Sequence, residues 1–599
     1  METMKRTYDC GSLRKGDRGK DAILNGWVHR KRNHGGIFFI NLRDRYGITQ
    51  VTVDTEKNPD LASVCDELRN EYVIAARGEV KARPDDMVNP SMDTGEIELA
   101  ASEIVILNRA DILPFQIDEE SKASEDLRLK YRYLDLRSSA MLSRIKTRSE
   151  TTFAVRKWMT ENGFLEIETP TFIKSTPEGA RDFLVPSRLY PGKFYALPQS
   201  PQLYKQILMV AGFDKYFQIA RCYRDEDSRG DRQPEFTQID IEMSFVDRDD
   251  ILKMTEGLMG HVFKEVLNID LPGAFRRLSW EEAMETYGSD KPDLRFDMCL
   301  RDFSQFAKES DFQAFREALS AGGAAKALVV KGGASYSRKQ IEELESRAKV
   351  YKARGLAWMK VASGPCLEGG VSKFFQDNAA KITEELGALE GDLILVAADA
   401  DRKIVNVSLG AVRSKLGRDL GLLDPARFEF AWIVDFPMFE YNEEEKKWEA
   451  AHHLFTCPQG KYLDSMESDP GSVKGDLYDL VLNGNELASG SIRIHDPDTQ
   501  KRVFNIVGIG PEEAQKKFGF LLEAFKYGCP PHGGIAPGLD RLVMIMSGLS
   551  SIKDVIAFPK NSFAVSPMDE CPSEVDKKQL DELRVTIRGE TNKNGDGLS

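Results

Sequence analysis

The chain has 599 residues, a length that predicts about three to five domains. Apolar residues make up 41% and charged residues 30%, which is ordinary for a globular protein and excludes a collagen-like or wholly disordered chain. The formal net charge of −14 argues against a protein that coats nucleic acid without sequence preference, because such binding neutralises phosphates wholesale.

The sequence predicts a cytoplasmic protein with no membrane anchor. No stretch reaches the roughly 20 consecutive apolar residues that a membrane helix needs, and the first residues lack the apolar core of a signal peptide. The eight cysteines are scattered singly. This pattern is typical of reduced thiols and indicates neither a zinc ribbon nor a redox dithiol.

Residues 1–108 are predicted to form a small Greek-key barrel of the OB type. Strand-like runs are expected at 23–28, 36–44, 48–53, 72–81 and 95–101, with a helix at 60–70. Five short strands with one helix between the third and the fourth match that arrangement.

The start of the chain is basic. Its first 35 residues carry nine basic and four acidic side chains, and the run from Arg30 to Arg32 leads into Phe38 and Phe39. One of these rings must face away from the core, because strand side chains alternate. Cations beside exposed rings are typical of a surface for single-stranded nucleic acid. A solvated basic edge over core phenylalanines is the alternative, and these residues alone leave both open.

Composition divides the rest of the chain. Residues 109–140 are polar and mixed in charge, which predicts a hinge. Residues 141–289 and 421–562 are predicted to be two parts of one domain. Residues 290–420, with their Ala/Gly-rich stretches, are predicted to form an inserted α+β domain. Residues 563–599 form a polar extension, and its last ten residues are expected to be disordered.

Apolar periodicity and stop signals give the expected elements beyond the barrel. Helices are expected at 142–162, 338–354, 372–386, 511–528 and 538–547. Strands are expected at 193–197, 216–223, 236–245, 392–397, 428–436, 493–494 and 503–507.

Three segments carry long motifs: 163–170 (GFLEIETP), 217–242 and 533–542 (GGIAPGLDRL). In this order, behind an OB-type N-terminus, they resemble motifs 1, 2 and 3 of the class II aminoacyl-tRNA synthetases, and the insertion resembles that of the bacterial-type aspartyl-tRNA synthetases. The resemblance covers essentially the whole chain. It implies a multidomain α+β fold, in which an OB barrel precedes an antiparallel-sheet catalytic domain with an inserted α+β domain.

The resemblance implies that ATP activates L-aspartate to aspartyl-adenylate, which then reacts with the 3′ end of tRNA(Asp). Arg224 and Arg541 are implied as the catalytic arginines. A fixed guanidinium at Arg224 would stabilise charge at the α-phosphate, and adenine would lie between Phe236 and Arg541. For each arginine taken singly, the alternative to a catalytic role is a surface salt bridge. Further ATP contacts are implied for Asp225, Glu226, Gln233, Glu486, Gly538, Leu539 and Asp540.

Two carboxylates, Asp479 and Glu486, flank an Asn483-Gly484 turn. On the two strands of a hairpin they would face each other, and carboxylates with phosphates are the usual ligands of Mg²⁺. The resemblance assigns both residues to Mg²⁺–ATP. Without the resemblance, the alternative interpretation is a turn that is exposed to solvent and binds no metal.

Lys205 and Arg493 match the aspartate pocket of the family. They would present two positive charges to one short carboxylate, and neutral asparagine would leave them unpaired at a cost of roughly 2–5 kcal/mol. Asp240 is implied to orient these cations. Glu178 is implied to lie on a loop that closes over the substrate and to contact its ammonium group. The other implied aspartate-binding residues are Ser200, Gln202, Arg224, His452 and His453.

On the barrel, the resemblance implies anticodon contacts for Arg32, Phe39, Gln50 and Glu98. With the resemblance, the barrel is therefore expected to bind nucleic acid. Pro170 in motif 1 resembles a dimer-interface proline, so a homodimer is expected.

Two positions bear on the choice of tRNA. His34 stands where relaxed enzymes, which charge both tRNA(Asp) and tRNA(Asn), often have histidine. The second position favours a small residue in such enzymes, and here it falls at the acidic Asp86. The two indicators disagree, so tRNA(Asp) is expected as the primary substrate and tRNA(Asn) is left open.

Two other functions are alternatives to this one. A related class II ligase for asparagine or lysine is disfavoured by Lys205 with Arg493 and by the large insertion. A non-catalytic RNA-binding paralogue predicts that catalytic or metal residues are lost, and Arg224, Arg541 and both carboxylates of the hairpin are present.

Overall fold

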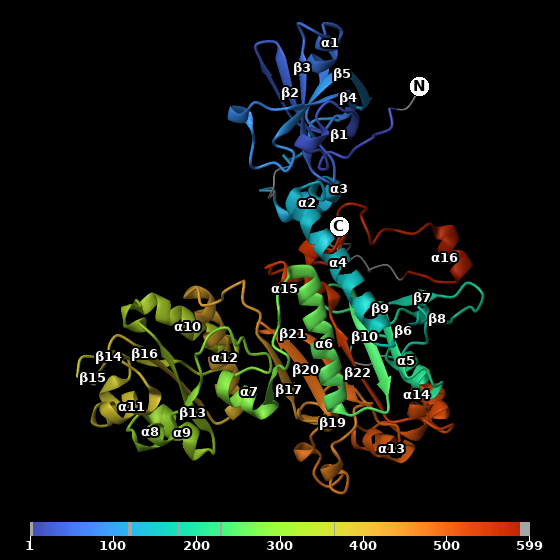
Figure 1. The fold of residues 1–599 in the computed structure, drawn as a ribbon. Helices are drawn as coiled ribbons and strands as arrows, with labels where there is room; N and C mark the ends of the chain where they lie inside the picture. The colour runs from blue at the N-terminus through green and yellow to red at the C-terminus, as the bar shows by residue number, and fades with distance from the viewer. Residues whose placement is uncertain (1–3, 118–121, 177–179, 228–229, 365, 588–599) are drawn as a thin grey trace, which may run out of the picture. The chain divides into compact units, whose positions relative to one another are not determined.

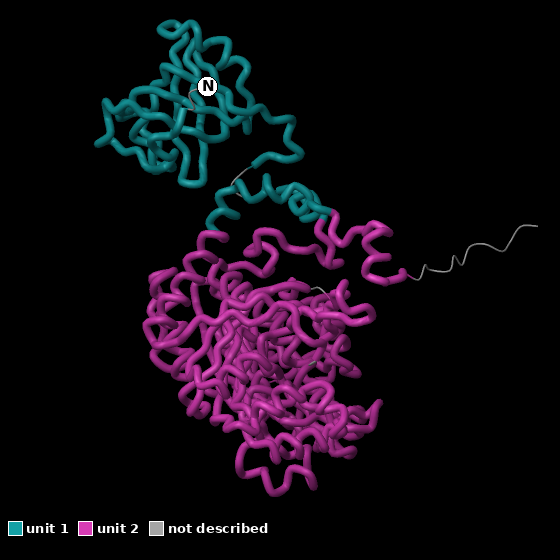
Figure 2. The backbone as a smooth tube through the Cα atoms, turned by 90° about the vertical axis from the view of Figure 1, so that its right-hand side faces the viewer, with its two compact units in different colours: residues 1–143, 567–569 teal, residues 144–566, 570–599 magenta. Residues whose placement is uncertain are grey.

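A computed structural model describes residues 4–117, 122–176, 180–227, 230–364 and 366–587. The backbone divides into two compact units, residues 1–143 with 567–569 and residues 144–566 with 570–599 (Figure 2). None of the described helices has the length and apolar character required to cross a bilayer.

The first unit is built on a closed five-stranded barrel with the strand order β1-β2-β3-β5-β4. Its elements are β1 (Asp21–His34), β2 (Ile37–Arg43), β3 (Ile48–Asp54), α1 (Asp60–Glu67), β4 (Val73–Ala82) and β5 (Ile97–Asn108). Burial alternates along β2, so Phe38 and Ile40 lie in the core while Phe39 faces away from it. This is the expected Greek-key barrel of the OB type.

The barrel continues into two short helices, α2 (Glu125–Lys130) and α3 (Arg132–Asp135). Just beyond them, the guanidinium of Arg137 donates to Glu71 Oε2 at 2.9 Å and lies 5.0 Å from the ring centroid of Trp27. Because Glu71 is 3% exposed, this ion pair attaches the end of the segment to the barrel.

The second unit is built on an eight-stranded sheet with the order β11-β17-β20-β21-β22-β10-β9-β6. Its strands are β6 (Leu165–Glu166), β9 (Lys215–Tyr223), β10 (Glu235–Ser244), β11 (Arg276–Ser279), β17 (Phe430–Val434), β20 (Leu477–Leu482), β21 (Asn485–Ile492) and β22 (His532–Pro537). All neighbours are antiparallel except the outer pairs β11 with β17 and β6 with β9. The predicted antiparallel sheet is therefore present.

Helices α4 (Ser139–Glu161) and α6 (Arg248–Leu267) run across this sheet (Figure 1). Their apolar side chains share one core with β10, β17, β20 and α15 (Leu539–Met546). A second, smaller core joins α5 (Gln202–Val210) to α14 (Pro511–Phe525). Two hairpins, β7 (Leu184–Pro186) with β8 (Phe194–Ala196) and β18 (Phe439–Asn442) with β19 (Lys447–Ala450), and the short helix α16 (Lys577–Leu583) complete the unit.

Between β11 and β17 the chain forms α7 (Trp280–Tyr287) and then a separate five-stranded sheet, with the order β12-β13-β16-β14-β15. Its strands are β12 (Arg301–Asp302), β13 (Ala324–Val330), β14 (Ala357–Ala362), β15 (Cys366–Glu368) and β16 (Leu393–Asp399). One core contains α10 (Arg338–Val350) and α12 (Arg402–Asp419), and the other contains α8 (Ser304–Glu309), α9 (Gln313–Ser320) and α11 (Ala379–Leu386). Residues 290–420 thus have cores of their own.

Two expected strands are wrong. Residues 493–494 lie just beyond β21, and Arg493 forms only an isolated bridge with Thr456. Residues 503–506 belong instead to the end of α13 (Pro497–Ile506), and Val507 is its C-cap. Asp496 caps this helix by accepting a hydrogen bond from the Thr499 N–H at 2.8 Å, and Pro497 has the fixed φ of a first helical residue. The apolar run that looked like a strand is therefore the buried side of a capped helix.

Candidate active site

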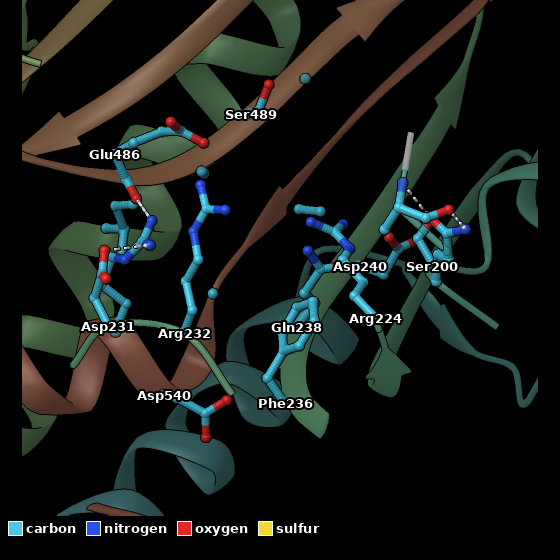
Figure 3. Close-up of a pocket in the computed structure, with 18 of the residues that line it drawn as sticks. Ser200, Arg224, Asp231, Arg232, Phe236, Gln238, Asp240, Glu486, Ser489 and Asp540 are labelled. Carbon is cyan, nitrogen blue, oxygen red and sulfur yellow. Dashed lines mark hydrogen bonds and ion pairs between the residues drawn. The ribbon is translucent and has the colours of Figure 1, made fainter. Parts of the chain in front are cut away.

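A cavity of about 520 Å³ lies over β10, β21 and the start of α15, and Figure 3 shows side chains from these elements around it. The predicted site residues that line it are Ser200, Gln202, Lys205, Arg224, Glu226, Gln233, Phe236, Asp240, His452, His453, Glu486, Arg493, Gly538, Asp540 and Arg541. They come from segments far apart in the sequence, so it is the sheet that brings them together.

Two cations and two carboxylates meet at one end of this cavity. Lys205 Nζ lies 3.1 Å from Asp240 Oδ1 and 3.3 Å from Glu242 Oε2. Arg493 binds Glu242 through two hydrogen bonds, Nε to Oε1 at 2.9 Å and Nη2 to Oε2 at 3.1 Å. All four side chains are 2% exposed or less. We call these four residues the charged quartet.

The strand positions explain the quartet. Asp240 and Glu242 are two residues apart on β10, so their side chains point to the same side. Gly534 pairs with Glu242 from β22, and a Cβ at Gly534 would lie 2.0 Å from Glu242 Oε2. Only glycine leaves room for the carboxylate at this position.

The two carboxyl groups of the quartet have opposite pKa shifts. Burial raises the pKa of Asp240 to about 6, and the nearby Lys205 opposes burial only in part. Burial also acts to raise the pKa of Glu242, but the charges of Arg493 and Lys205 outweigh it and bring that pKa to about 2. Glu242 is therefore the fixed counter-charge of the two cations.

Two histidines line the same cavity, and one of them, His453, contacts the quartet. Burial, reinforced by the positive charge of Arg493, lowers the pKa of His453 well below its usual value, and burial also lowers the pKa of His452. His453 Nε2 lies 2.7 Å from Arg493 Nη1, while its Nδ1 accepts a hydrogen bond from the Phe455 N–H at 3.2 Å. At neutral pH these rings add no positive charge to the pocket.

The same cavity carries the residues predicted to hold the nucleotide. The Arg224 guanidinium lies 5.0 Å from the ring centroid of Phe236, as a cation over an aromatic face. Arg541 donates to the backbone carbonyl of Glu486 and lies 3.4 Å from Asp231 Oδ2. Adenine between Phe236 and Arg541 stays a prediction.

Asp540 is bound from two sides. Its Oδ1 accepts a hydrogen bond from Arg148 on α4 at 2.6 Å, and its Oδ2 accepts one from the Thr237 N–H at 2.7 Å. The carboxylate therefore positions the start of α15, which carries Arg541. The neighbouring Leu539 is 1% exposed in the core.

Asp479 and Glu486 lie on β20 and β21, but they are not directly opposite each other. Asp479 pairs with Ser489 and Glu486 pairs with Val481, because the register shifts after Leu480. Both side chains still point to the same side of the hairpin, since Asp479 is two residues from Val481.

The residues of this hairpin fit a hard cation. Burial and then the charge of Glu486 raise the pKa of Asp479 well above its usual value, and Asp479 Oδ1 is buried with no hydrogen-bond partner. A bound cation would compensate such an oxygen. In the described part of the chain, no three His, Cys, Asp or Glu side chains gather around a metal position, so the remaining ligands would be phosphate oxygens or water.

The four predicted anticodon residues share the outer face of the barrel. The register pairs Arg32 with Phe39, and Gln50 Nε2 donates to Glu98 Oε2 at 3.1 Å. Thr52, which pairs with Phe39, also donates to Glu98, so all four predicted residues point the same way. A half-buried ring beside an exposed arginine and an amide–carboxylate pair is a surface that can stack and read bases.

The two predicted discrimination residues are exposed. His34 follows Arg32 by two positions along β1 and so projects to the same side as the anticodon residues. Asp86 lies in a single 3₁₀ turn between β4 and β5.

Some predictions fall elsewhere, and some residues were missed. Glu178 lies outside the described residues, and Asp225 pairs with Arg181 at 3.6 Å. Glu242 was assigned no role, although its spacing of two from Asp240 on a strand could have indicated that it shares the pocket. Lys291 also lines the cavity, and no local pattern could have indicated this.

Comparisons with known proteins follow the same division of the chain. A family described as tRNA synthetases class II (D, K and N) matches residues 124–562, and the OB-fold nucleic acid binding domain matches residues 22–107. A Treponema denticola protein named aspartate–tRNA(Asp/Asn) ligase is 66% identical over 98% of this chain and 100% of its own length. A Macrococcus caseolyticus protein named aspartate–tRNA ligase is 50% identical over 97% and 98%, respectively.

A solved structure shows the likeness of fold. Asparaginyl-tRNA synthetase from Pyrococcus horikoshii, in complex with asparaginyl-adenylate, superposes with a TM-score of 0.58 at 18% identity. The match covers 93% of this chain and 98% of that one.

Proposed function

This chain belongs to the class II tRNA synthetases for aspartate, lysine and asparagine, and from that premise we propose that it is an aspartate–tRNA ligase. In the first step, L-aspartate and ATP form aspartyl-adenylate and pyrophosphate. In the second, the terminal adenosine hydroxyl of tRNA takes the aspartyl group. Neither step requires a nucleophile from the enzyme, so the work of the site is positioning and charge stabilisation.

The charged quartet is the observation that supports aspartate as the amino acid. Arg493 and Lys205 line the cavity, and their ion pairs with Glu242 and Asp240 orient them. A side-chain carboxylate would pair with both cations, whereas asparagine offers no charge and lysine would add a third positive charge.

Arg224, which lines the same cavity, supports the chemical step. The aspartate α-carboxylate attacks the α-phosphorus of ATP, and negative charge builds on the phosphate oxygens as pyrophosphate leaves. A guanidinium that already lies in the cavity over Phe236 would stabilise that charge without moving far.

Mg²⁺ is part of the proposal, with Asp479 and Glu486 as the residues that would hold it together with ATP. When bound, it would neutralise part of the triphosphate charge. The buried, unpartnered oxygen of Asp479 is the observation that supports this assignment.

We extend the proposal to both tRNA(Asp) and tRNA(Asn). The basic and aromatic outer face of the barrel supports binding of the anticodon, and the exposed His34 on the same side supports relaxed specificity. The acidic Asp86 argues against relaxed specificity, because a small residue is expected at that position. The close relatives named for tRNA(Asp/Asn) therefore decide between one tRNA and both.

Charging of purified tRNAs with labelled aspartate tests this function. Aspartyl product is expected on both tRNA(Asp) and tRNA(Asn). Product on tRNA(Asp) alone would contradict the relaxed specificity, and no product on either tRNA would contradict the assignment as a ligase.

Phe39→Ala is expected to raise the KM for tRNA by roughly fivefold to a hundredfold, because one base loses its stacking partner. Leu107→Ala, which changes an exposed apolar residue of β5, is the control.

A homodimer is the assembly we propose. Apolar side chains of the motif 1 region are exposed in the single chain: Phe153 is 71%, Leu165 52% and Phe172 59% exposed. Large exposed apolar residues on neighbouring elements are typical of an interface. Sedimentation equilibrium is expected to give twice the monomer mass, and monomer alone at micromolar concentration would contradict the proposal.

The cytoplasm is the compartment we propose. All eight cysteines are free thiols, and no two of them form a disulfide. Free thiols are typical of a reducing compartment, which also supplies ATP and tRNA.

A further inference from the structure

The segment that enters the five-stranded sheet also reaches the active-site cavity. Residues 288–300 connect α7 to β12, and Lys291 in this segment lines the cavity. Its Nζ lies 4.0 Å from Glu486 Oε2, beyond hydrogen-bond distance, and half of its side chain is exposed. The ammonium group therefore stands beside the two carboxylates of the β20–β21 hairpin without being held by them.

A buried arginine from α12 fixes this segment from one side. The Arg413 guanidinium donates to the backbone carbonyls of Asp293 at 2.9 Å, Phe296 at 3.0 Å and Met298 at 2.6 Å. Arg413 is 1% exposed and lies 4.0 Å from the ring centroid of Phe296. Three carbonyls bound by one rigid cation leave the path of the segment little freedom.

Two glycines allow close packing on either side of Lys291. Gly484 in the β20–β21 turn has a φ of +78°, and a Cβ there would lie 3.0 Å from Asp293 Cβ. Gly288 at the end of α7 has a φ of +67°, and a Cβ there would lie 2.2 Å from the Asn406 carbonyl of α12. The segment is thus clamped between α12 and the hairpin that carries Glu486.

Four other cations of the cavity already have carboxylate partners, and a fifth, Arg224, lies over the ring of Phe236. Arg232 lies 3.1 Å from Glu226, Arg541 lies 3.4 Å from Asp231, and Arg493 and Lys205 are bound within the charged quartet. Among the described ion pairs of the lysines and arginines that line this cavity, that of Lys291 is the longest. The Lys291 ammonium group can therefore bind a ligand without first losing a hydrogen bond to a protein side chain.

We propose that Lys291 binds the β- and γ-phosphates of ATP, and hence the pyrophosphate that leaves, and that residues 290–420 serve to position it. This inference rests on the proposed function. With the α-phosphate at Arg224, the rest of the triphosphate would extend toward Glu486, beside which Lys291 stands. A lysine ammonium is a compact charge that binds phosphate oxygens well.

Lys291→Met tests the phosphate contact, because it keeps the length of the side chain and removes the charge. The KM for pyrophosphate in aspartate-dependent ATP–pyrophosphate exchange is expected to rise at least about tenfold, with the KM for aspartate within twofold of wild type. Lys339→Met, on the exposed side of α10, is the matched control and is expected to change neither value. Values for Lys291→Met within twofold of wild type would overturn the proposal.

Calorimetric binding of inorganic pyrophosphate with Mg²⁺ separates this inference from the proposed function. If wild type binds pyrophosphate but shows no aspartate-dependent exchange, the ligase assignment fails while Lys291→Met still tests the contact. Equal pyrophosphate affinity in wild type and Lys291→Met would overturn the contact.

Arg413→Met tests the positioning, and it is expected to raise the KM for pyrophosphate more than it lowers kcat at saturation. If Arg413→Met does not fold, Gly484→Ala, which pushes on Asp293, replaces it, and the KM for pyrophosphate is again expected to change more than kcat. A larger change in kcat than in the KM would overturn the positioning role.

Discussion

Arg493→Ala is expected to abolish aspartate-dependent ATP–pyrophosphate exchange. The substitution removes one of the two cations that we propose to bind the side-chain carboxylate of the substrate, and it leaves Glu242 with Lys205 alone. Losing one partner of a buried charge pair costs about 3–5 kcal/mol, which corresponds to a loss of roughly a hundredfold to several thousandfold in kcat/KM for aspartate.

Arg502→Ala is the matched control for this variant. Arg502 also binds a carboxylate, Glu467, but both side chains are about one-third or more exposed. Exchange by Arg502→Ala is therefore expected to stay within about twofold of wild type. If Arg493→Ala kept more than a tenth of the wild-type kcat/KM for aspartate, the pocket would be wrongly assigned.

Glu242→Gln is expected to destabilise the second unit more than any exposed substitution. It leaves Arg493 and Lys205 buried with only Asp240 as a counter-charge. The carboxyl pKa falls from 4.5 to about 2 on folding, so ionised Glu242 contributes about 3 kcal/mol of stability. Because the folded pKa is the lower one, this contribution is complete above about pH 4.5 and is lost as the pH falls through 2.

Asp240→Asn provides the comparison two residues away. The pKa of Asp240 rises from 3.8 to about 6 on folding, so its ionised form is disfavoured in the folded state. Its stabilising contribution is present below the unfolded pKa and is lost as the pH rises through about 6. At pH 7, Asp240→Asn is therefore expected to leave the free energy of unfolding unchanged or higher, while activity falls because Lys205 loses a partner. Urea unfolding of both variants at pH 7 measures the contrast, and equal losses of stability would contradict it.

Local pattern was enough to predict the barrel and that one of Phe38 and Phe39 faces outward, whereas the anticodon residues came from the resemblance to the family. Strand alternation places Phe38 inside and Phe39 outside, and the register then brings Arg32 to the same side as Phe39. The same reasoning applied to Asp240 could have found Glu242. These contacts depend on periods of two within a strand, which a sequence displays directly.

Contacts between distant segments could not be predicted in this way. Lys291 reaches Glu486 because Arg413, more than a hundred residues further along, fixes the path of the intervening chain. The strand expected at 503–507 failed for a related reason, since Asp496 and Pro497 begin a helix whose apolar residues then face a core built from other parts of the chain. Spacing within a segment carries no information about such partners.

The pairing of β10 with β22 has a consequence for synthesis of the protein. Residue 244 ends β10 and residue 532 begins β22, and at about 5–20 residues per second a ribosome takes roughly 15–60 s to make the chain between them. During that interval β10 is an edge strand of the nascent chain, open to pairing with other molecules. Asp240 and Glu242 then lie on that edge with Lys205 but without Arg493, and charged side chains on an open edge discourage wrong pairing. We therefore expect the two carboxylates that later pair with Lys205 and Arg493 to discourage wrong pairing of the unfinished sheet as well.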